Sequence, residues 1–100
     1  MTPIRISRII YAEKESRANY VTIYCVGDLH RYRCSMSKME SQLADFDFVK
    51  PSSSAIVNLE HIIQIKDNTI FLNGGYEYHI TSARYRKMIA NKFMNFMRNE

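Results

Sequence analysis

The chain has 100 residues, 46% of them hydrophobic, which predicts one globular domain over residues 1–100 and argues against a disordered chain. Fourteen Lys and Arg residues against ten Asp and Glu residues give a formal net charge of +4, an excess that favours a phosphate-bearing partner if it lies on one side. No apolar run approaches the roughly 20 residues of a membrane span, so we expect a cytoplasmic protein without a membrane partner.

Three short strands are predicted in the first third of the chain. Residues 9–15 and 20–26 are rich in β-branched and aromatic side chains, and Gly27-Asp28 leads into a third such segment at residues 29–34. The polar sequence KESRAN connects the first two strands. We therefore expect an antiparallel hairpin preceded by one further strand.

The two cysteines flank the turn of this hairpin. If Val26 faces Leu29, then Cys25 lies opposite His30, and the sulfurs of Cys25 and Cys34 are about 13 Å apart at about 3.3 Å per residue, too far for a disulfide. Cys25 and His30 would face each other as two metal ligands, but only the distant Cys34 shares that face. We expect reduced thiols, no metal site and no cofactor.

A short amphipathic helix is predicted next. Four apolar residues recur at spacings of three, four and three, and Ser37 with Glu40 forms a candidate capping box; the four are Met36, Met39, Leu43 and Phe46. Pro51 and the serines at 52–54 then form a short polar loop before the apolar residues Ile56 and Val57.

A second hairpin is predicted over residues 62–66 and 69–72, with the turn at Asp67-Asn68. Its pairing places four residues on one apolar face, namely Ile63, Ile65, Ile70 and Leu72. A two-residue loop after Leu72 would set Glu77 on that face, whereas a three-residue loop, Asn73-Gly74-Gly75, sets Tyr76 and Tyr78 there. We expect the three-residue loop, with Glu77 and His79 turned outward.

The last predicted element is a helix that begins near Ser82. Its apolar side consists of Tyr85, Met88, Ile89, Phe93, Phe96 and Met97. Together the segments predict a mainly β fold with minor α content, in which small antiparallel sheets are joined by one short internal helix and a C-terminal helix.

The titratable side chains do not suggest an enzyme. The three histidines fall on different elements, and neither a nucleophile elbow, a P-loop nor the zinc-protease spacing is present. We therefore expect no catalytic residues.

The basic residues are more informative by position than by number. Lys14 and Arg17 lie in or beside the first connector, Lys50 directly precedes the Pro and serine loop, and Arg84, Arg86 and Lys87 lie where the last helix begins. Loops and helix N-termini hold phosphates, and Arg and Asn side chains read guanine and adenine edges in the major groove. This placement suits nucleic-acid binding, but most surface Arg and Lys residues only keep a protein soluble, so charge placement alone does not decide between the two.

Three blocks of sequence, in this order, resemble the LytTR-type DNA-binding domains of bacterial response regulators. They are IIYAEKESRANYVTIYC, FVKPSSSAIVNLEHIIQI and YHITSARYRKMI, and with the helix between the first two the resemblance extends from about Arg5 to Met97. It implies an effector domain of a bacterial transcription regulator in a two-component system, which binds double-stranded DNA with loops inserted in the major groove. It also implies paired domains on repeated half-sites and a receiver domain in a longer parent chain.

The resemblance assigns roles residue by residue. Its base-reading positions fall on Asn19, Ser53 and Arg84, and its phosphate-holding positions fall on Ser54 and Lys87. Charge and placement alone add Arg17 and Lys50 as phosphate contacts. The family often has a His or Arg with an aromatic residue in the central loop, where this chain has SSSA, so a loop that only holds phosphate is the alternative for Ser53.

Other interpretations remain for the remaining polar residues and for the domain. Asn58 is expected to cap the turn after Val57 rather than to contact DNA, and Asn19 either closes a turn before Tyr20 or reads a base. The rival function is a protein-interaction module in which exposed Tyr and Met residues of the C-terminal helix bind a partner without DNA.

Overall fold

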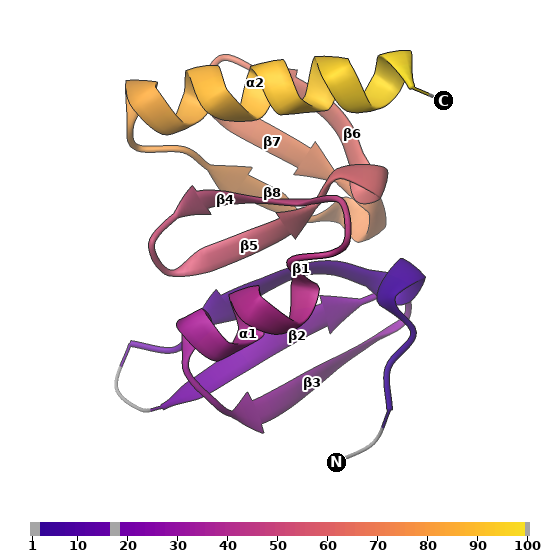
Figure 1. Cartoon of the computed structure of the whole chain (residues 1–100), viewed down its shortest axis with the longest axis vertical. Coiled ribbons are helices and arrows are strands. Elements are labelled where there is room, and N and C mark those ends of the chain that lie inside the picture. Colours follow the sequence, from indigo (N-terminus) through magenta and orange to yellow (C-terminus); the bar gives the residue numbers. More distant parts are fainter. Residues whose placement is uncertain (1–2, 17–18, 100) are drawn as a thin grey trace.

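The computed structural model describes residues 3–16 and 19–99, which form two antiparallel sheets and two α-helices (Figure 1). The first sheet has the order β3-β2-β1-β5-β4, with β1 Ile9–Lys14, β2 Tyr20–Cys25, β3 Asp28–Arg33, β4 Phe48–Ser52 and β5 Ala55–Asn58. The second has the order β6-β7-β8, with β6 Ile62–Lys66, β7 Thr69–Leu72 and β8 Glu77–His79. The helices are α1 Met36–Leu43 and α2 Ala83–Arg98. The predicted mainly β class is confirmed.

The first sheet lies between two layers, and this position explains its most apolar strand. All four residues of β5 are buried. Ile56 packs with Met36, Met39 and other residues on the α1 side, whereas Val57 packs on the opposite side with the second sheet and α2. A strand covered on both faces has a continuous apolar sequence instead of an alternating one, as AIV does here. Figure 1 shows α2 at the top of the molecule and α1 against the first sheet. Helix α2 also contacts β4 of the first sheet.

A cluster of tyrosines fills the space between the two sheets. The rings of Tyr11 and Tyr24, from neighbouring strands of the first sheet, stack with their centroids 4.4 Å apart. Tyr76 and Tyr78 approach Tyr11 edge-on from the second sheet, with centroid distances of 5.6 and 6.2 Å. Edge-to-face packing of this kind adds to the stabilisation from burial alone. The predicted three-residue loop is confirmed, since Tyr78 pairs with Ile70 on the apolar face.

The predicted register of the first hairpin is wrong. Cys25 pairs with Asp28, and Ile23 pairs with His30, so the two-residue turn is Val26-Gly27 instead of Gly27-Asp28. Gly27 has a φ of 84°, and it therefore occupies the turn position that only glycine adopts without strain. Side chains keep their faces, because the pairing moves by two positions in total. Both cysteines are free thiols, as expected.

The second hairpin confirms its predicted turn but not all of its predicted apolar face. Ile65 pairs with Ile70 on either side of Asp67-Asn68. A bulge between Ile62 and Gln64 then exchanges the faces of the strand, so that Ile62 is 7% exposed and Ile63 is 62% exposed. One extra residue in a strand reverses the side chains beyond it, and the placement of Ile63 in the core was therefore wrong.

Both helices occur where the sequence predicts them, with different details at their ends. The Ser35 hydroxyl accepts a hydrogen bond from the Lys38 backbone N–H at 3.1 Å, so Ser35 is the N-cap of α1, and the predicted capping box of Ser37 and Glu40 is wrong. Helix α1 ends at Leu43, which leaves Phe46 beyond it and exposed. Met97 is also exposed, unlike the other residues of the predicted apolar side of α2.

The stretch around Pro51 is a hairpin, not the longer polar loop that the sequence predicts. Pro51 is buried inside β4, and only Ser53 and Ser54 form the turn to β5. Proline has no N–H to donate, so it is tolerated in β4 because β4 is the edge strand of its sheet. The pairing of β4 with β5 is irregular between Val49 and Ser52, on either side of the proline.

Asn58 has the structural role that the sequence predicts. Its Oδ1 accepts a hydrogen bond from the backbone N–H of Glu60 at 3.0 Å, and its Nδ2 donates to the Ile9 carbonyl at 2.8 Å. These bonds satisfy a buried amide and fasten the turn after β5 to the start of β1. No helix of the described chain is long and apolar enough to cross a membrane.

Candidate nucleic-acid interface

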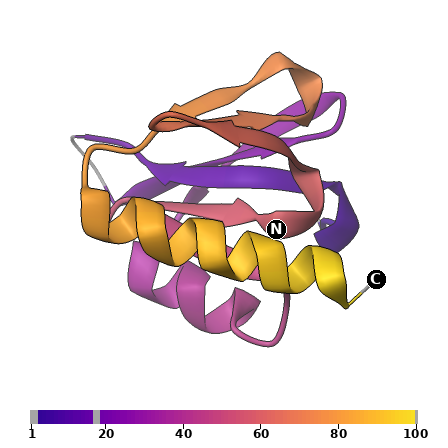
Figure 2. The ribbon, with the colours of Figure 1, turned by 90° about the horizontal axis from the view of Figure 1, so that it is seen from above.

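Three connections that are distant in sequence lie along one edge of the molecule. They are the β1–β2 connector, the β4–β5 turn and the link from β8 into α2, and both ribbon views place them on the same side (Figures 1 and 2). We call this the loop edge and define it by residues 14–16 and 19, Ser53–Ser54 and residues 81–87. The predicted sites Asn19, Ser53 and Arg84 therefore lie on one side of the molecule, one on each connection.

Hydrogen bonds fix these connections relative to one another. The Lys14 backbone N–H donates to the Ser54 carbonyl at 2.7 Å, which ties the end of β1 to the serine turn. Ser52 of β4 and Tyr78 of β8 share a hydrogen bond of 2.9 Å between their hydroxyls. The Arg86 guanidinium donates to the Asp67 carbonyl, which ties the start of α2 to the β6–β7 turn. The loop edge is therefore held by contacts within and between the two sheets.

Of the three serine hydroxyls around the serine turn, that of Ser53 is exposed and those of Ser52 and Ser54 are hydrogen-bonded. The Ser52 hydroxyl accepts from the Ser54 backbone N–H at 3.2 Å and lies 3.2 Å from the Ser54 hydroxyl. Ser53, at the tip, is exposed. The candidate base contact Ser53 is therefore accessible, whereas the candidate phosphate contact Ser54 is half-buried and already bonded to its neighbour.

The β1–β2 connector is anchored by an ion pair at its first residue, Glu15. The Glu15 carboxylate accepts a hydrogen bond from Arg31 Nε at 2.6 Å and another from the Thr22 hydroxyl at 3.2 Å. The bond from Arg31 is the main cause that holds the pKa of Glu15 below its usual value. The same guanidinium lies 3.8 Å from the centroid of the Tyr20 ring. Asn19, directly before Tyr20, is exposed, and Arg17 lies outside the described residues.

Three basic residues lie at the start of α2, and only one of them has a hydrogen-bond partner in the described chain. Arg84 and Lys87 are exposed and form no hydrogen bond or ion pair within the described chain, whereas Arg86 is bound to the Asp67 carbonyl. The positive end of the helix dipole does not stabilise a cation in the first turn. An anion that approached this end would be favoured by both the dipole and the two free cations.

Lys50 is less available than the sequence suggests. Its ammonium lies 2.9 Å from the Glu40 carboxylate of α1, and its side chain is only partly exposed. Lys50 belongs to β4, two residues before Ser52, instead of to a loop. A phosphate at this position would have to compete with Glu40.

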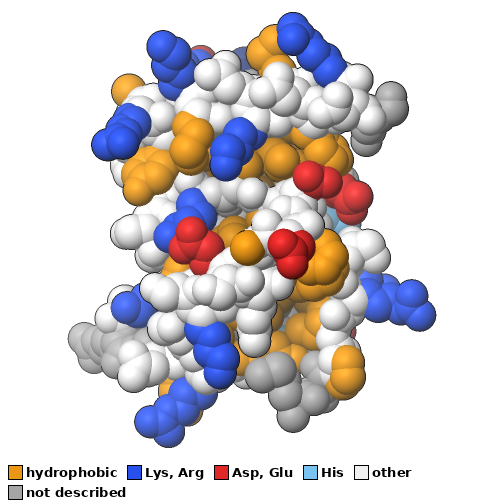
Figure 3. Space-filling model, viewed as in Figure 1, with side chains coloured by type: hydrophobic (Ala, Val, Ile, Leu, Met, Phe, Trp, Pro, Cys, Tyr) orange, Lys and Arg blue, Asp and Glu red, His pale blue; other side chains and the backbone are white. Residues whose placement is uncertain are grey.

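Arg33 is a basic residue of this edge that the sequence reading missed. It is exposed, pairs with Tyr20 at the end of β3, and so lies beside the β1–β2 connector. The hairpin register could have predicted this position, because a residue that pairs with the start of β2 lies at the same edge as the β1–β2 connector. Figure 3 shows basic side chains at several heights along this edge and acidic ones toward the middle of the same face.

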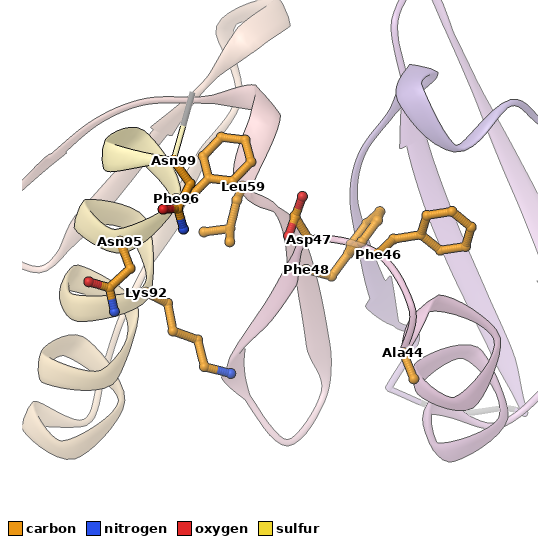
Figure 4. A pocket seen from close by; sticks show the side chains of 9 residues that line it. All are labelled: Ala44, Phe46, Asp47, Phe48, Leu59, Lys92, Asn95, Phe96 and Asn99. Carbon is orange, nitrogen blue, oxygen red and sulfur yellow. The ribbon is translucent and has the colours of Figure 1, made fainter.

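Several pockets lie on the surface of the described chain. One of about 480 Å³ lies between α2 and the α1–β4 link, where Lys92 reaches toward the β4–β5 hairpin and the Phe46 ring turns away toward the first sheet (Figure 4). The histidines lie apart: His61 donates from Nε2 to the Ser7 carbonyl and accepts at Nδ1 from the Asn73 amide, and His79 lies beside Thr69. The prediction that the histidines fall on separate elements is confirmed.

Comparison with known proteins identifies the family. A family model described as the LytTr DNA-binding domain matches residues 1–94. The chain belongs to the LytTR family of DNA-binding domains. The family is one of DNA-binding domains rather than of enzymes.

A solved structure shows the same fold. It is the LytTr DNA-binding domain of a putative methyl-accepting/DNA response regulator from Bacillus cereus, with a TM-score of 0.75 and 20% sequence identity. The alignment covers 91% of this chain and 85% of that one. No curated protein matches this chain significantly. The family match and the similarity to this solved structure therefore both indicate the mainly β LytTR fold.

Proposed function

We propose that this LytTR domain binds specific sequences of double-stranded DNA through the loop edge, as the effector domain of a bacterial transcription regulator acting in the cytoplasm. The observation that carries this proposal is the alignment of three separate connections along one edge, where Arg84 and Lys87 have no partner within the described chain. Free cations beside exposed loops are what a phosphate backbone requires.

The dimensions of the domain support contact with successive major grooves. The loop edge runs along the longest axis of the molecule, whose extent is 35 Å (Figure 1). One turn of B-DNA measures about 34–36 Å along its axis. A domain laid with this edge against the duplex therefore spans about one helical turn, so its two ends face the same side of the DNA.

The chemistry of each side chain supports a division of labour. Arg84 suits bidentate contact with guanine and Asn19 suits adenine, because their donor and acceptor groups match those base edges in the major groove. Ser53, with one short hydroxyl, suits either a base edge or a phosphate. Lys87 supplies a point charge for phosphate.

Four further residues complete the proposed phosphate contacts. Arg33 joins Lys87 because it is exposed beside the connector. Ser54 and Lys50 remain proposals with competing partners, namely the Ser52 hydroxyl and Glu40. Arg17 remains a proposal from charge and position alone.

The test is selection of bound duplexes from a random oligonucleotide pool, followed by anisotropy titration of the selected site against a scrambled one. Specific binding predicts an affinity ratio of about 10³ or more between the two duplexes. Equal affinity for both would contradict sequence-specific recognition. The spacing of motifs in the selected pool tests the proposal that paired domains bind repeated half-sites.

Attachment to a receiver domain in a longer parent chain is likewise a proposal, which the family resemblance supports. Sequencing the gene beyond both ends of this chain tests it directly. A reading frame without a phosphorylatable receiver segment would contradict it.

An exposed apolar region favours the second candidate, a protein-interaction module. Ile63 and Met94 are exposed and line a groove between β6 and α2 together with Ile65 and Phe93. Such a groove suits the apolar face of a partner helix. If no duplex from the pool is retained at low salt, this function replaces DNA binding.

A further inference from the structure

Three side chains with metal-binding atoms meet at the turn of the first hairpin. Cys25 is the last residue of β2, Asp28 is the first residue of β3, and the two pair directly across the Val26-Gly27 turn. His30 follows Asp28 by two residues, so its side chain lies on the same face of the sheet. One ligand atom from each of the three lies within 4.8 Å of the others.

We propose that Cys25, Asp28 and His30 bind one Zn²⁺ ion, with the fourth coordination position open to water. A thiolate, an imidazole and a carboxylate are the side-chain ligands that zinc uses, and three protein ligands with an open position form a recurrent zinc arrangement. The thiolate and imidazole select against Mg²⁺ and Ca²⁺, which prefer oxygen ligands alone. The site is independent of DNA binding and is not needed for it.

The fold brings the three groups close before any ion arrives. Cys25 is 2% exposed and packs in the core beside α1, while the Asp28 and His30 side chains retain access to solvent. His30 Nε2 and Asp28 Oδ2 lie 3.2 Å apart. An ion entering from the solvent side would replace this hydrogen bond with one bond to His30 and one to Asp28. Its third protein ligand would be the sulfur of the buried Cys25.

The groups around the Cys25 thiol have opposing effects on a divalent cation. Burial and the Asp28 charge raise the pKa of the Cys25 thiol, and the nearby Arg8 guanidinium, bound to the Val26 carbonyl, lowers it by less. A metal ion displaces the thiol proton and offsets the repulsion between thiolate and carboxylate. The positive charge of Arg8 repels the ion, and the hydrogen bond from Arg8 to the Val26 carbonyl keeps this guanidinium in place.

The sequence-based register had concealed this cluster. With Cys25 opposite His30, the nearest third ligand on that face was Cys34, too distant to share an ion. The observed register moves Asp28 directly opposite Cys25 and keeps His30 on the same face. Asp28 is thus the ligand that the sequence reading lacked.

The distance from the loop edge makes the site testable separately. Cys25 and Tyr20 are the two ends of β2, so the cluster lies about 17 Å from the β1–β2 connector at about 3.3 Å per residue. Metal binding should therefore be unchanged in Arg84→Ala. Failure of DNA binding and failure of metal binding can then be distinguished.

The experiment titrates tag-free, reduced protein with Co²⁺ and follows its absorption, and then displaces Co²⁺ with Zn²⁺. We expect one equivalent to produce a thiolate-to-cobalt charge-transfer band in the near ultraviolet, which Zn²⁺ abolishes. His30→Gln and Asp28→Asn should each weaken binding by more than about 10-fold, the smallest loss that even outer-shell changes cause. Cys25→Ser should remove the band.

Matched controls keep the result specific. Cys34→Ser and His79→Gln remove the same chemical groups outside the cluster and should leave the band and the affinity unchanged. Circular dichroism verifies that each variant is folded, and His30→Gln decides the matter if Cys25→Ser unfolds, since His30 lies at the partly exposed side. Absence of a charge-transfer band at saturating Co²⁺, or its loss in Cys34→Ser, would overturn the proposal.

Discussion

The Ser52 hydroxyl in the first sheet and the Tyr78 hydroxyl in the second lie 2.9 Å apart. This bond joins the two sheets next to the serine turn. The Ser52 hydroxyl also accepts a hydrogen bond from the Ser54 backbone N–H. The exposed tip, Ser53, is therefore presented by a turn whose base is bonded to the neighbouring sheet. Rigid support of this kind reduces the conformational entropy that a loop loses when it binds.

A change at Ser52 should affect stability, whereas a change at Ser53 should affect DNA affinity. We expect Ser52→Ala to lower the free energy of unfolding by about 1 kcal/mol, because the Tyr78 hydroxyl and the Ser54 N–H lose a partner. Ser53→Ala should leave stability unchanged, since its hydroxyl is exposed, and should weaken DNA binding. Urea unfolding and anisotropy titration measure the two effects.

Tyr78→Phe is the matched control, because it removes the other hydroxyl of the same bond and keeps the ring. It should destabilise by an amount similar to Ser52→Ala, and the double variant should lose less than the sum of the two. Full additivity would show that the bond does not contribute to stability in solution.

Arg84 and Lys87 should differ in how they affect specificity. Arg84→Ala should cost about 1–3 kcal/mol on the selected site and little on a scrambled duplex, because a base contact is lost. Its expected partner is guanine, so substitution of that base should cost the unaltered protein a similar amount. Anisotropy titration on both duplexes measures this difference, and equal losses on both would refute the base-reading role.

Lys87→Ala is expected to weaken all duplexes alike. Because it removes one phosphate contact, the slope of log affinity against log salt should decrease by about one unit. Arg98→Ala, in the last turn of the same helix and so far from the loop edge, serves as a control of equal charge. An Arg98→Ala effect as large as that of Lys87→Ala would place the interface elsewhere.

Most elements were predictable because each depends on a local pattern. The strands, the C-terminal helix and the three-residue loop before Tyr76 follow from alternation, helical spacing and glycine. The errors occur where one residue changes the register: the turn position of Gly27, the bulge that exposes Ile63, and the choice of Ser35 as N-cap. Such choices depend on the energy of the whole sheet or helix, which no short pattern contains.

The sequence predicted which connections carry the candidate residues, but not which of these residues already have a bonding partner. The sequence placed Asn19, Ser53 and Arg84 on three connections, and these connections lie at one edge. It gave no indication that Lys50 is paired with Glu40, since these residues are joined only when α1 packs beside β4. Tertiary contacts decide which cations remain free.

Asn58→Ala should be among the most destabilising single changes in the first sheet. The substitution leaves the buried Ile9 carbonyl and the Glu60 N–H without the partners that Asn58 supplies. The expected loss is about 2–3 kcal/mol, from unsatisfied buried groups together with the lost bonds. Urea unfolding measures it, and Asn73→Ala, at an exposed amide that contacts His61, is the control, with a smaller expected loss.

The ion pair of Glu15 with Arg31 predicts a pH dependence with a definite sign. The pKa of Glu15 is lowered in the folded state, so its contribution to stability is present above its ordinary value of about 4.5 and is lost as the pH falls through the lower folded value. At pH 7, Glu15→Gln should therefore be less stable than the unaltered protein. The difference should shrink as the pH falls below the folded-state pKa of Glu15, because the Glu15 carboxyl is then protonated and as uncharged as the glutamine amide.

Urea unfolding at several pH values checks this dependence, with Glu77→Gln as the control. Glu77 is exposed on β8 and forms no ion pair within the described chain, so its replacement should have the same small effect at each pH. Because Glu15 is close to the surface, added salt should reduce the effect of Glu15→Gln at pH 7. If the difference between the two proteins stays the same over the whole acid range, Arg31 does not stabilise the carboxylate, and the connector that bears Asn19 is anchored by other contacts.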